Sequence, residues 1–401
     1  MNILVVNAGS SSIKYQLIDM PSGVVKCVGL IERIGFKDAI FNHEKGDEKY
    51  QEILPILHHE DGMKKIATTL LDKNIGVISN VQEIDAVGHR VVHGGSQFTK
   101  TVLITNTIKE KIKALSDLAP LHNPANLIGI EISTSVFSSA KQIAVFDTAF
   151  HQSMPQEAYQ YAIPQKFLKE SKIRAYGFHG TSHKYVSEKA IDYLQKPTSN
   201  IITIHLGNGC SMSAIKDGKC IDTSLGFGPM NGLVMGTRSG DIDPSALFYM
   251  YRALHMSMEE IYTMLQKESG LKGLTGFSDL REIEKAAQQG NQDCINALKL
   301  TTYRIKKFIG SYAAILNGLD AIVFTAGIGE NSETIRNMVC KNLDYLGIKI
   351  DVNKNNIRSK ELREIQDENS FVKILVIPTN EEIEIAKQSF ALLKLIPNQL
   401  N

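Results

Sequence analysis

The chain contains an internal repeat, and this feature constrains the fold more than any other. The segment from Ile3, ILVVNAGSSSIKYQLID followed by MPSG and VVKCVG, resembles the segment from Ile201, IITIHLGNGCSMSAIK followed by DGK and CIDTS. In both, a strand-like run enters a loop of small residues, a second run leaves it, and a glycine-containing turn starts a third. Gly9 aligns with Gly207. A chance likeness between two hairpins is the alternative; a true duplication predicts two related domains, each presenting a glycine-rich loop to a shared ligand.

The rest of the chain alternates between strand-like and helix-like segments. Short β-branched runs bounded by turn residues are typical of buried central strands. They occupy residues 3–6, 86–88, 143–146, 201–204, 321–325 and 374–377. Segments with helical periodicity occupy residues 63–73, 184–194, 257–268, 280–289, 291–316 and 382–395. This alternation predicts an α/β fold.

The length of 401 residues exceeds what one hydrophobic core usually serves, so two domains with a cleft between them are expected. We place the boundary near Thr148 to Met154. The first domain is expected to contain residues 1–150 and 383–401, because the last helical segment would pack back on the first half. Residues 151–382 form the second domain.

Composition narrows the class of protein. Lys and Arg number 44 and Asp and Glu 43, so the formal net charge of +1 gives no general attraction to nucleic acids or membranes. The five cysteines are scattered and lack C-x-x-C spacing, which argues against disulfides and zinc. With no apolar stretch long enough to cross a membrane and no basic leader pattern, we expect a soluble cytoplasmic protein.

Three glycine-containing loops are candidates for binding phosphate. Glycine lets backbone amides approach an anion closely, and both NAGSSSIK, with Lys14, and HLGNGCS have this character. The third, FTAGIGEN at residues 324–331, lies between a strand-like run and a helix start near Ser332. None matches the P-loop or dinucleotide patterns, so each loop taken alone is also compatible with a purely structural turn.

Two arginines lie among glycines beside strand-like runs, in GHRVVHGG and MGTRSGDIDP. Arg90 and Arg238 therefore differ from arginines on solvated helix faces, and their guanidinium groups suit a carboxylate or a phosphoryl oxygen. Buried salt bridges are the structural alternative.

Histidines cluster as His122 in LAPLHNP, His151 after FDTAF, and His179 with His183 in YGFHGTSH. The four-residue spacing of the last pair is found in helical zinc sites, but no glutamate lies between them and no cysteine is near. Imidazoles that donate to a developing phosphoryl charge are favoured instead. His151 is equally compatible with a structural role.

Two acids follow predicted strands. Asp147 follows IAVF and Glu381 follows ILVIPTN, which places each at the carboxyl edge of a sheet, where α/β folds gather ligands. Mg²⁺ takes one or two such carboxylates together with phosphate oxygens and water. Helix capping is the alternative for both acids.

Taken together, these segments resemble the acetokinase family nearly from end to end. NAGSSSIK, GHRVVHGG, LAPLHNP, FDTAFH, YGFHGTSH, HLGNG, GTRSGDIDP, GIGEN and PTNEE appear in the family's order and at comparable spacing. The implied fold is that of the acetate and sugar kinase, heat-shock ATPase and actin superfamily: two duplicated ribonuclease H-like domains with the active site in the cleft between them. The segments GFGPMNG and LTGFSDLR differ from the family's commonest sequences at these places.

The resemblance implies a role for each matching position. Catalytic residues would be Asp147, which the family treats as a proton donor or acceptor, and the transition-state stabilisers His179 and Arg238. Arg90 would bind the substrate carboxylate, with His122 nearby and Val92, Leu121, Phe178 and Pro229 around the acyl methyl. Asn7 and Glu381 would belong to the Mg²⁺ region. Nucleotide contacts would come from Ser10, Ser12, Lys14, His205, Leu206, Gly207, Asn208, Gly209, Asp279, Leu280, Arg281, Gly327, Ile328, Gly329, Glu330 and Asn331.

The implied reaction is reversible phosphoryl transfer from ATP to acetate, giving ADP and acetyl phosphate, with Mg²⁺ or alternatively Mn²⁺. Acetate is already ionised at neutral pH and needs no general base, so we assign Asp147 to the metal and its water. Propionate is the alternative acceptor, because one methylene changes specificity little, and the branched Val92 favours acetate. Butyrate is disfavoured, since Ala8 stands where butyrate-specific relatives have proline. Chaperones and filaments share the fold but need no arginine and histidine set around an acyl pocket. A homodimer is implied by the family alone.

Overall fold

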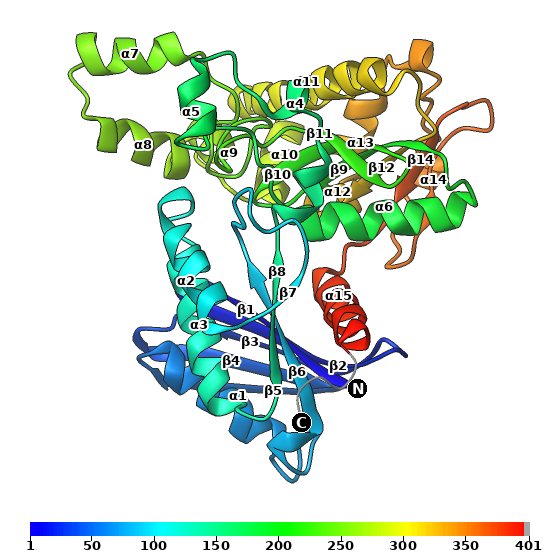
Figure 1. Cartoon of the computed structure of the whole chain (residues 1–401). Coiled ribbons are helices and arrows are strands. Elements are labelled where there is room, and N and C mark those ends of the chain that lie inside the picture. Colours follow the sequence, from blue (N-terminus) through cyan, green and yellow to red (C-terminus); the bar gives the residue numbers. More distant parts are fainter. Residues whose placement is uncertain (397–401) are drawn as a thin grey trace. The chain divides into compact units, whose positions relative to one another are not determined.

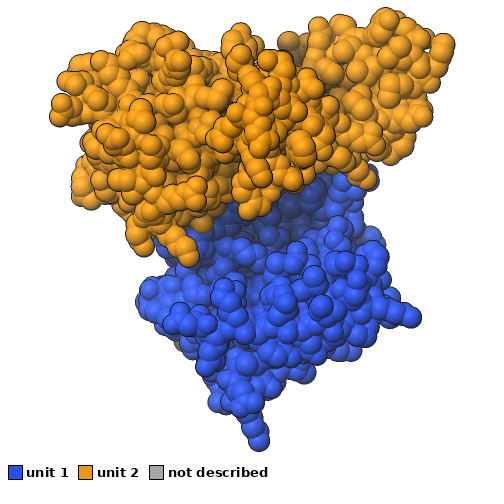
Figure 2. All heavy atoms as spheres, turned by 180° about the vertical axis from the view of Figure 1, so that it is seen from behind, with its two compact units in different colours: residues 1–150, 380–401 blue, residues 151–379 orange. Residues whose placement is uncertain are grey.

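The computed structural model describes residues 1–396, and the chain forms two compact units (Figures 1 and 2). Unit 1 contains residues 1–150 and the C-terminal segment from Asn380, and unit 2 contains residues 151–379. Each unit is built around one mixed β-sheet.

The unit 1 sheet has the strand order β5-β4-β3-β2-β1-β6-β8-β7. Strands β1 to β5 form an antiparallel meander, and β6 and then β8 continue the sheet parallel to β1. The strands are β1 (Asn2–Ala8), β2 (Ser12–Asp19), β3 (Val24–Glu32), β4 (Phe36–Lys45), β5 (Glu48–Ile56), β6 (Ile84–Val91), β7 (Val102–Leu103) and β8 (Lys141–Phe146).

The unit 2 sheet repeats the central part of this topology, with the order β11-β10-β9-β12-β14-β13. Strands β9, β10 and β11 form an antiparallel meander, and β12 and β14 follow in parallel with β9. The strands are β9 (Asn200–Leu206), β10 (Cys210–Lys216), β11 (Lys219–Thr223), β12 (Ala321–Thr325), β13 (Arg363–Glu364) and β14 (Lys373–Val376). The order β3-β2-β1-β6-β8 thus recurs as β11-β10-β9-β12-β14, and the predicted duplication and α/β class are confirmed.

Helices cover both faces of the unit 1 sheet (Figure 1). Leu4 and Val6 of β1 join a core with α1 (His59–Leu70) and the region of α3 (Asn123–Val136). Ile3 and Val5 point to the other face, where they meet α15 (Glu381–Leu395). Burial on both faces explains why β1 is a continuous apolar run. α2 (Asn106–Ala114) packs on α3.

In unit 2, α6 (Gly180–Leu194) packs on β9 and β12, and α11 (Gln292–Leu316) packs on β9 and β10. The further helices are α4 (Gln156–Tyr159), α5 (Gln165–Lys169), α7 (Pro244–Ala253), α8 (Met258–Lys267), α9 (Gly270–Thr275), α10 (Leu280–Gln288), α12 (Ala326–Asn331), α13 (Glu333–Cys340) and α14 (Val352–Asn355). The predicted helices at 257–268, 280–289 and 291–316 correspond to α8, α10 and α11 within one residue at each end. The one predicted at 63–73 begins four residues earlier and ends three earlier, as α1.

One local prediction was wrong. The segment GIGEN was expected to be a loop, but residues 326–331 form the short helix α12. The buried Arg336 of α13 donates hydrogen bonds of 2.9 and 3.0 Å to the carbonyls of Gly329 and Glu330 at the end of this turn. These bonds satisfy carbonyls that a helix end leaves without partners, and so stabilise the helical form.

The five cysteines are free and buried. Among residues 1–396, no helix has the length and apolar character required to cross a membrane.

Candidate functional site

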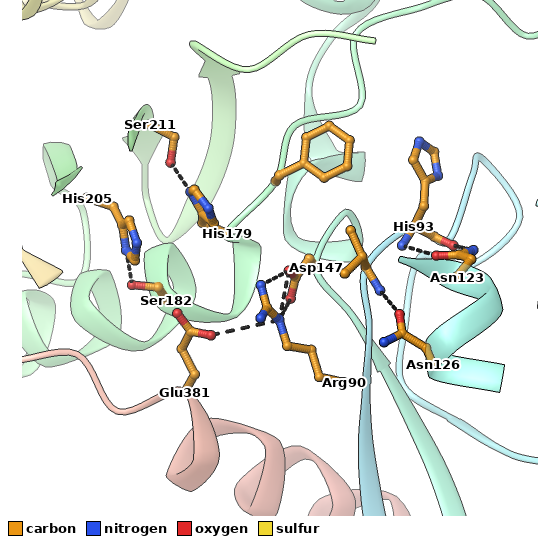
Figure 3. Close-up of polar contacts among 12 residues, drawn as sticks. Arg90, His93, Asn123, Asn126, Asp147, His179, Ser182, His205, Ser211 and Glu381 are labelled. Atoms are coloured by element: carbon orange, nitrogen blue, oxygen red, sulfur yellow. Dashed lines mark hydrogen bonds and ion pairs between the residues drawn. The ribbon is translucent and has the colours of Figure 1, made fainter. Parts of the chain in front are cut away.

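In unit 1, Arg90 and Asp147 form a tight ion pair at the ends of two parallel strands (Figure 3). Arg90 Nε lies 3.1 and 3.0 Å from the two Asp147 carboxylate oxygens, and Nη2 lies 2.6 Å from Oδ2. The Asp147 backbone N–H also donates to the carbonyl of Val91 at 3.0 Å, which extends the β6·β8 pairing by one residue. Two planar groups joined at this geometry hold the guanidinium in one orientation.

Glu381, the first residue of α15, is the second acid beside Arg90. Its Oε2 lies 3.9 Å from Arg90 Nε. Burial, with the charges of Asp147 and Glu382, raises the pKa of Glu381 against the opposing charges of Arg90 and Lys14. Burial by itself would lower the pKa of Arg90, but the two carboxylates raise it, so this guanidinium stays charged.

The first glycine-rich loop lies next to these groups in the same unit. It is the tight turn between β1 and β2, closed by a 2.8 Å bond from the Gly9 N–H to the Ser12 carbonyl. Asn7 and Lys14 face each other across the hairpin, and Lys14 Nζ forms a 2.6 Å ion pair with Glu382 of α15. Ser10 is exposed at the tip of the turn and Ser12 is half-buried.

Two asparagines of α3 hold the segment that follows β6 (Figure 3). Asn126 accepts from the Val92 N–H at 3.1 Å and donates to the Ala8 carbonyl at 2.8 Å. Asn123 accepts from the His93 N–H at 3.0 Å and donates to the His93 carbonyl at 2.9 Å. Asn126 thus joins the first glycine-rich loop to the strand end that carries Arg90.

The predicted acyl-pocket residues of unit 1 differ in exposure. Val92 is buried, whereas Leu121 is 46 % exposed and next to His122, the N-cap residue of α3. In unit 2, Phe178 is buried and Pro229 is half-buried.

In unit 2, His179 is the N-cap residue of α6 and has a left-handed backbone conformation, with φ of 56°. Its Nδ1 lies 2.9 Å from Ser211 Oγ, and its ring stacks on His205 with the ring centres 4.4 Å apart (Figure 3). His205 is held in turn by Ser182 Oγ, 2.8 Å from its Nδ1. Contacts on one edge and one face therefore fix the orientation of the His179 ring.

The second glycine-rich loop is the turn between β9 and β10, and Arg238 and His179 converge on it. A Cβ at Gly209 would lie 2.7 Å from Arg238 Nη2 and 3.2 Å from His179 Nε2, so both nitrogens closely approach the backbone of this residue. Nη1 of Arg238 donates to the Pro229 carbonyl. Burial lowers the pKa of Arg238, although an arginine remains charged in proteins. One guanidinium and one imidazole at the same glycine of this turn are suited to a phosphoryl group.

The predicted adenosine residues also lie in unit 2. Asp279 caps α10 by accepting from the Arg281 N–H at 2.9 Å, and it pairs with the guanidinium of Arg281, whose side chain is 89 % exposed. Leu280 is buried. In α12, Glu330 accepts from the Thr379 N–H at 3.0 Å, and Asn331 donates to the Gly327 carbonyl at 2.8 Å.

The other histidines are structural in their contacts. Buried His151 lies 3.1 Å from Cys220 Sγ and 2.9 Å from the Phe178 carbonyl. His183 is fully buried between Thr203 and Ser211. Within residues 1–396, no group of three or more His, Cys, Asp or Glu side chains is arranged to hold a metal by itself.

Sequence reasoning did not identify Asn123, Asn126, Ser182 or Ser211. All four lie inside or within a few residues of the quoted motifs, but their roles depend on partners distant in sequence. The signal available in the sequence was a polar residue inside or close to a glycine-containing motif.

Comparisons with known proteins agree with one another. The sequence profile of the Acetokinase family matches residues 2–387. The chain is 61 % identical over 394 residues to an acetate kinase of Flavobacterium johnsoniae, covering 98 % of this chain and 100 % of that protein.

Solved structures show the same likeness. The acetate kinase of Porphyromonas gingivalis matches with a TM-score of 0.93 and 42 % identity, covering 98 % of this chain and 99 % of that one. A propionate kinase from Francisella tularensis matches with a TM-score of 0.91 and 45 % identity, covering 96 % and 98 % of the two chains.

Proposed function

The chain belongs to the acetokinase family, and we propose that it is an acetate kinase, which transfers the terminal phosphoryl group of ATP reversibly to acetate. The observation that carries this proposal is the approach of Arg238 and His179 to Gly209 of the second glycine-rich loop. A guanidinium and an imidazole at this glycine provide charge and hydrogen bonds where a phosphoryl group in transfer needs them.

Unit 1 supplies the arginine for the substrate carboxylate and the acids for the metal. Arg90 is proposed to bind the acetate carboxylate, with Val92, Leu121, Phe178 and Pro229 around the methyl group. In unit 1, the groups proposed to bind the phosphates are Asn7, Ser10, Ser12 and Lys14. In unit 2, the second glycine-rich loop, residues 279–281 and α12 are proposed to bind the nucleotide.

The acids of unit 1 fit a divalent cation by their chemistry. Asp147, Glu381 and Glu382 are three carboxylates, and Arg90 and Lys14 are two cations, so one negative charge is left over when all are ionised. Burial is the main cause of the raised pKa of Glu381, and the neighbouring carboxylates of Asp147 and Glu382 raise it further. We propose that Glu381 and Asp147, with Asn7, hold Mg²⁺, directly or through water, with Mn²⁺ as an alternative ion. When bound, the ion neutralises charge on the phosphates.

The chemistry needs charge neutralisation more than proton transfer. An acetate oxygen forms a new bond to the γ-phosphorus while the bond from that phosphorus to the bridging oxygen of ADP breaks. Acetate is already an anion, so no base removes a proton. Asp147 is engaged by Arg90, which supports a role in orienting the guanidinium and argues against a role as base. Arg90, Arg238 and His179 bring the two anions together and stabilise the charge on the phosphoryl oxygens.

Propionate is the second candidate acceptor. The likeness to a propionate kinase structure favours this possibility, and one extra methylene changes specificity by only about 1–3 kcal/mol. Val92 has a branched side chain in a buried position, which favours the smaller acid.

Two further properties follow from the family resemblance and are proposed with the activity: a homodimeric assembly and a cytoplasmic location. The near-zero formal net charge supports neither a nucleic acid nor a membrane partner.

The activity is tested by trapping acyl phosphate with hydroxylamine in the presence of ATP and Mg²⁺. Acetate, propionate and butyrate are supplied in turn. We expect the highest kcat/KM with acetate, a lower value with propionate, and little product with butyrate. Higher kcat/KM with propionate would make propionate the substrate, and no trapped product with any of the three would reject the proposed function.

A further inference from the structure

Behind His179, three buried side chains of unit 2 continue a line of hydrogen bonds that the mechanism above does not use. Ser211 Oγ lies 2.9 Å from His179 Nδ1 and 2.7 Å from His183 Nε2. His183 Nδ1 then lies 2.7 Å from Thr203 Oγ1. The last three residues, Ser211, His183 and Thr203, have no exposed surface. One serine hydroxyl is therefore shared between two imidazole rings.

With both rings neutral, counting hydrogens restricts this arrangement to two forms. The Ser211 hydroxyl has one hydrogen, so it donates to one ring and accepts from the other. In the first form, Thr203 donates to His183 Nδ1, His183 Nε2–H donates to Ser211, and Ser211 donates to His179 Nδ1. In the second form every bond is reversed, and His179 carries its proton on Nδ1.

The surroundings favour the first form. The Cε1–Nε2 edge of the His179 ring faces Gly209, beside Arg238 Nη2, and Nε2 is the nitrogen on that edge. In the first form this atom carries a hydrogen and donates to a phosphoryl oxygen. In the second form a neutral ring would present a lone pair to that oxygen, which is repulsive.

His183 is suited to serve as a neutral link. Burial, with the neighbouring rings of His151 and His205, holds the pKa of His183 well below its ordinary value. The ring is therefore uncharged at physiological pH, with one nitrogen donating and the other accepting. A neutral His183 ring donates to one of Thr203 and Ser211 and accepts from the other. The position of its proton therefore sets the direction of all the hydrogen bonds from Thr203 to His179.

We propose that His183 and Ser211 are positioning residues that keep the proton of His179 on Nε2, directed at the transferring phosphoryl group. The catalytic half of this inference rests on the proposed function, whereas the proton position does not. Neither residue contacts substrate; each acts through His179.

The test combines nitrogen NMR with kinetics on the full-length protein. With ¹⁵N-labelled histidine, and the His179 signals assigned by their loss in His179→Gln, the wild-type ring is expected to show a protonated Nε2 and an unprotonated Nδ1. Ser211→Ala removes one oxygen and is expected to give a mixed proton position. It should lower kcat about five- to tenfold, with KM for ATP and acetate nearly unchanged.

Matched variants separate this role from simple packing. Ser213→Ala removes another buried hydroxyl from β10, one that donates to Thr223 and has no place in the line, and kcat should stay near wild type. His183→Gln keeps an N–H able to donate to Ser211 and should retain more kcat than His183→Leu. A double variant Ser211→Ala/His183→Leu should have the same kcat as His183→Leu, because both changes interrupt the same chain of hydrogen bonds.

A wild-type His179 protonated on Nδ1 would overturn the inference, and so would a Ser211→Ala enzyme no slower than Ser213→Ala. If NMR shows the expected proton position but no variant or wild-type protein makes acyl phosphate, the proposed function fails while the proton position stands.

Discussion

Arg90 is the cation that faces two carboxylates of unit 1, the buried Asp147 and the half-buried Glu381. Its guanidinium lies within 3.1 Å of both Asp147 oxygens and 3.9 Å from Glu381. The side chain of Asp147 is only 1 % exposed, so solvent cannot replace the lost charge. The same residue therefore contributes to stability, and in the proposed function it also binds the substrate carboxylate.

Replacing Arg90 by alanine should show both effects. We expect kcat/KM for acetate to fall about 10²- to 10³-fold, because a charged donor is lost from the site. Stability should fall by about 3–5 kcal/mol, since a buried carboxylate is left without its partner. Steady-state kinetics measures the change in kcat/KM, and urea unfolding measures the change in stability. Arg90→Lys keeps the charge but loses the planar pairing with Asp147, so its kcat/KM and stability should lie between those of the wild type and Arg90→Ala. A variant with normal kcat/KM would contradict the assigned role.

Val92 is expected to limit the size of the acyl group. In Val92→Ala, the ratio of kcat/KM for propionate to kcat/KM for acetate should rise by about 10-fold, because the smaller side chain leaves space for one more methylene. The neighbouring Val91→Ala is the control, because Val91 packs into the hydrophobic cluster with Phe98 and Ile112 and should change stability only. Unchanged substrate preference in Val92→Ala would show that other residues set the limit.

Asp222 of β11 makes stability depend on pH. Burial raises the pKa of Asp222 to about 6, against the bond from the Thr223 N–H that lowers it. The folded protein then holds a proton that the unfolded chain releases, so stability falls as pH rises from about 4 to about 6 and stays low above.

Asp222→Asn cannot ionise and keeps the oxygen that accepts from Thr223. It should lose this part of the pH dependence and exceed the wild type by about 1–3 kcal/mol at pH 7, with little difference at pH 4. Urea unfolding at the two pH values measures it. A difference that grows toward low pH would contradict the assignment.

At the scale of elements, the turn between β9 and β10 leaves little space for a side chain at Gly209. Gly209→Ala places a methyl group 2.7 Å from Arg238 Nη2 and 3.2 Å from His179 Nε2. Both side chains must shift, and kcat should fall about 100-fold or more, as misplacement of about 1 Å does in other sites. Gly310→Ala in α11, where a Cβ meets nothing within 4 Å, is the control and should keep full activity. Equal activity in the two variants would exclude the turn from the site.

The elements differ in how well their sequences predict them. β1, β9 and β12 were predictable because burial on both faces requires continuous apolar runs. β4 and β5 were not predicted, since their hairpin is half exposed and rich in charged residues. Helix α12 was taken for a loop because its glycines favour loops. The arginines that satisfy the carbonyls at its end, Arg336 and Arg363, lie beyond it in the sequence. Asn126 and Ser211 gain their roles from contacts that spacing alone does not reveal.

At the scale of the whole molecule, the duplicated sheet order gives each unit a glycine-rich hairpin at the equivalent position. The repeat between Ile3 and Ile201 predicted this because a strand pair and its turn are local in sequence. The two units then differ in what surrounds the hairpin: acids and Arg90 in unit 1, and histidines and Arg238 in unit 2. In the proposed reaction the first set serves acetate and the metal, and the second set serves the phosphoryl group.

The central claim is that the phosphoryl group passes directly from ATP to acetate, with positive side chains and a metal offsetting the repulsion between anions. The stereochemical course with ATP made chiral at the γ-phosphorus tests this most directly. One in-line displacement predicts inversion of configuration in acetyl phosphate. Retention would contradict the account, because it requires two displacements and a phosphorylated side chain, with Glu381 or Asp147 as the acceptor.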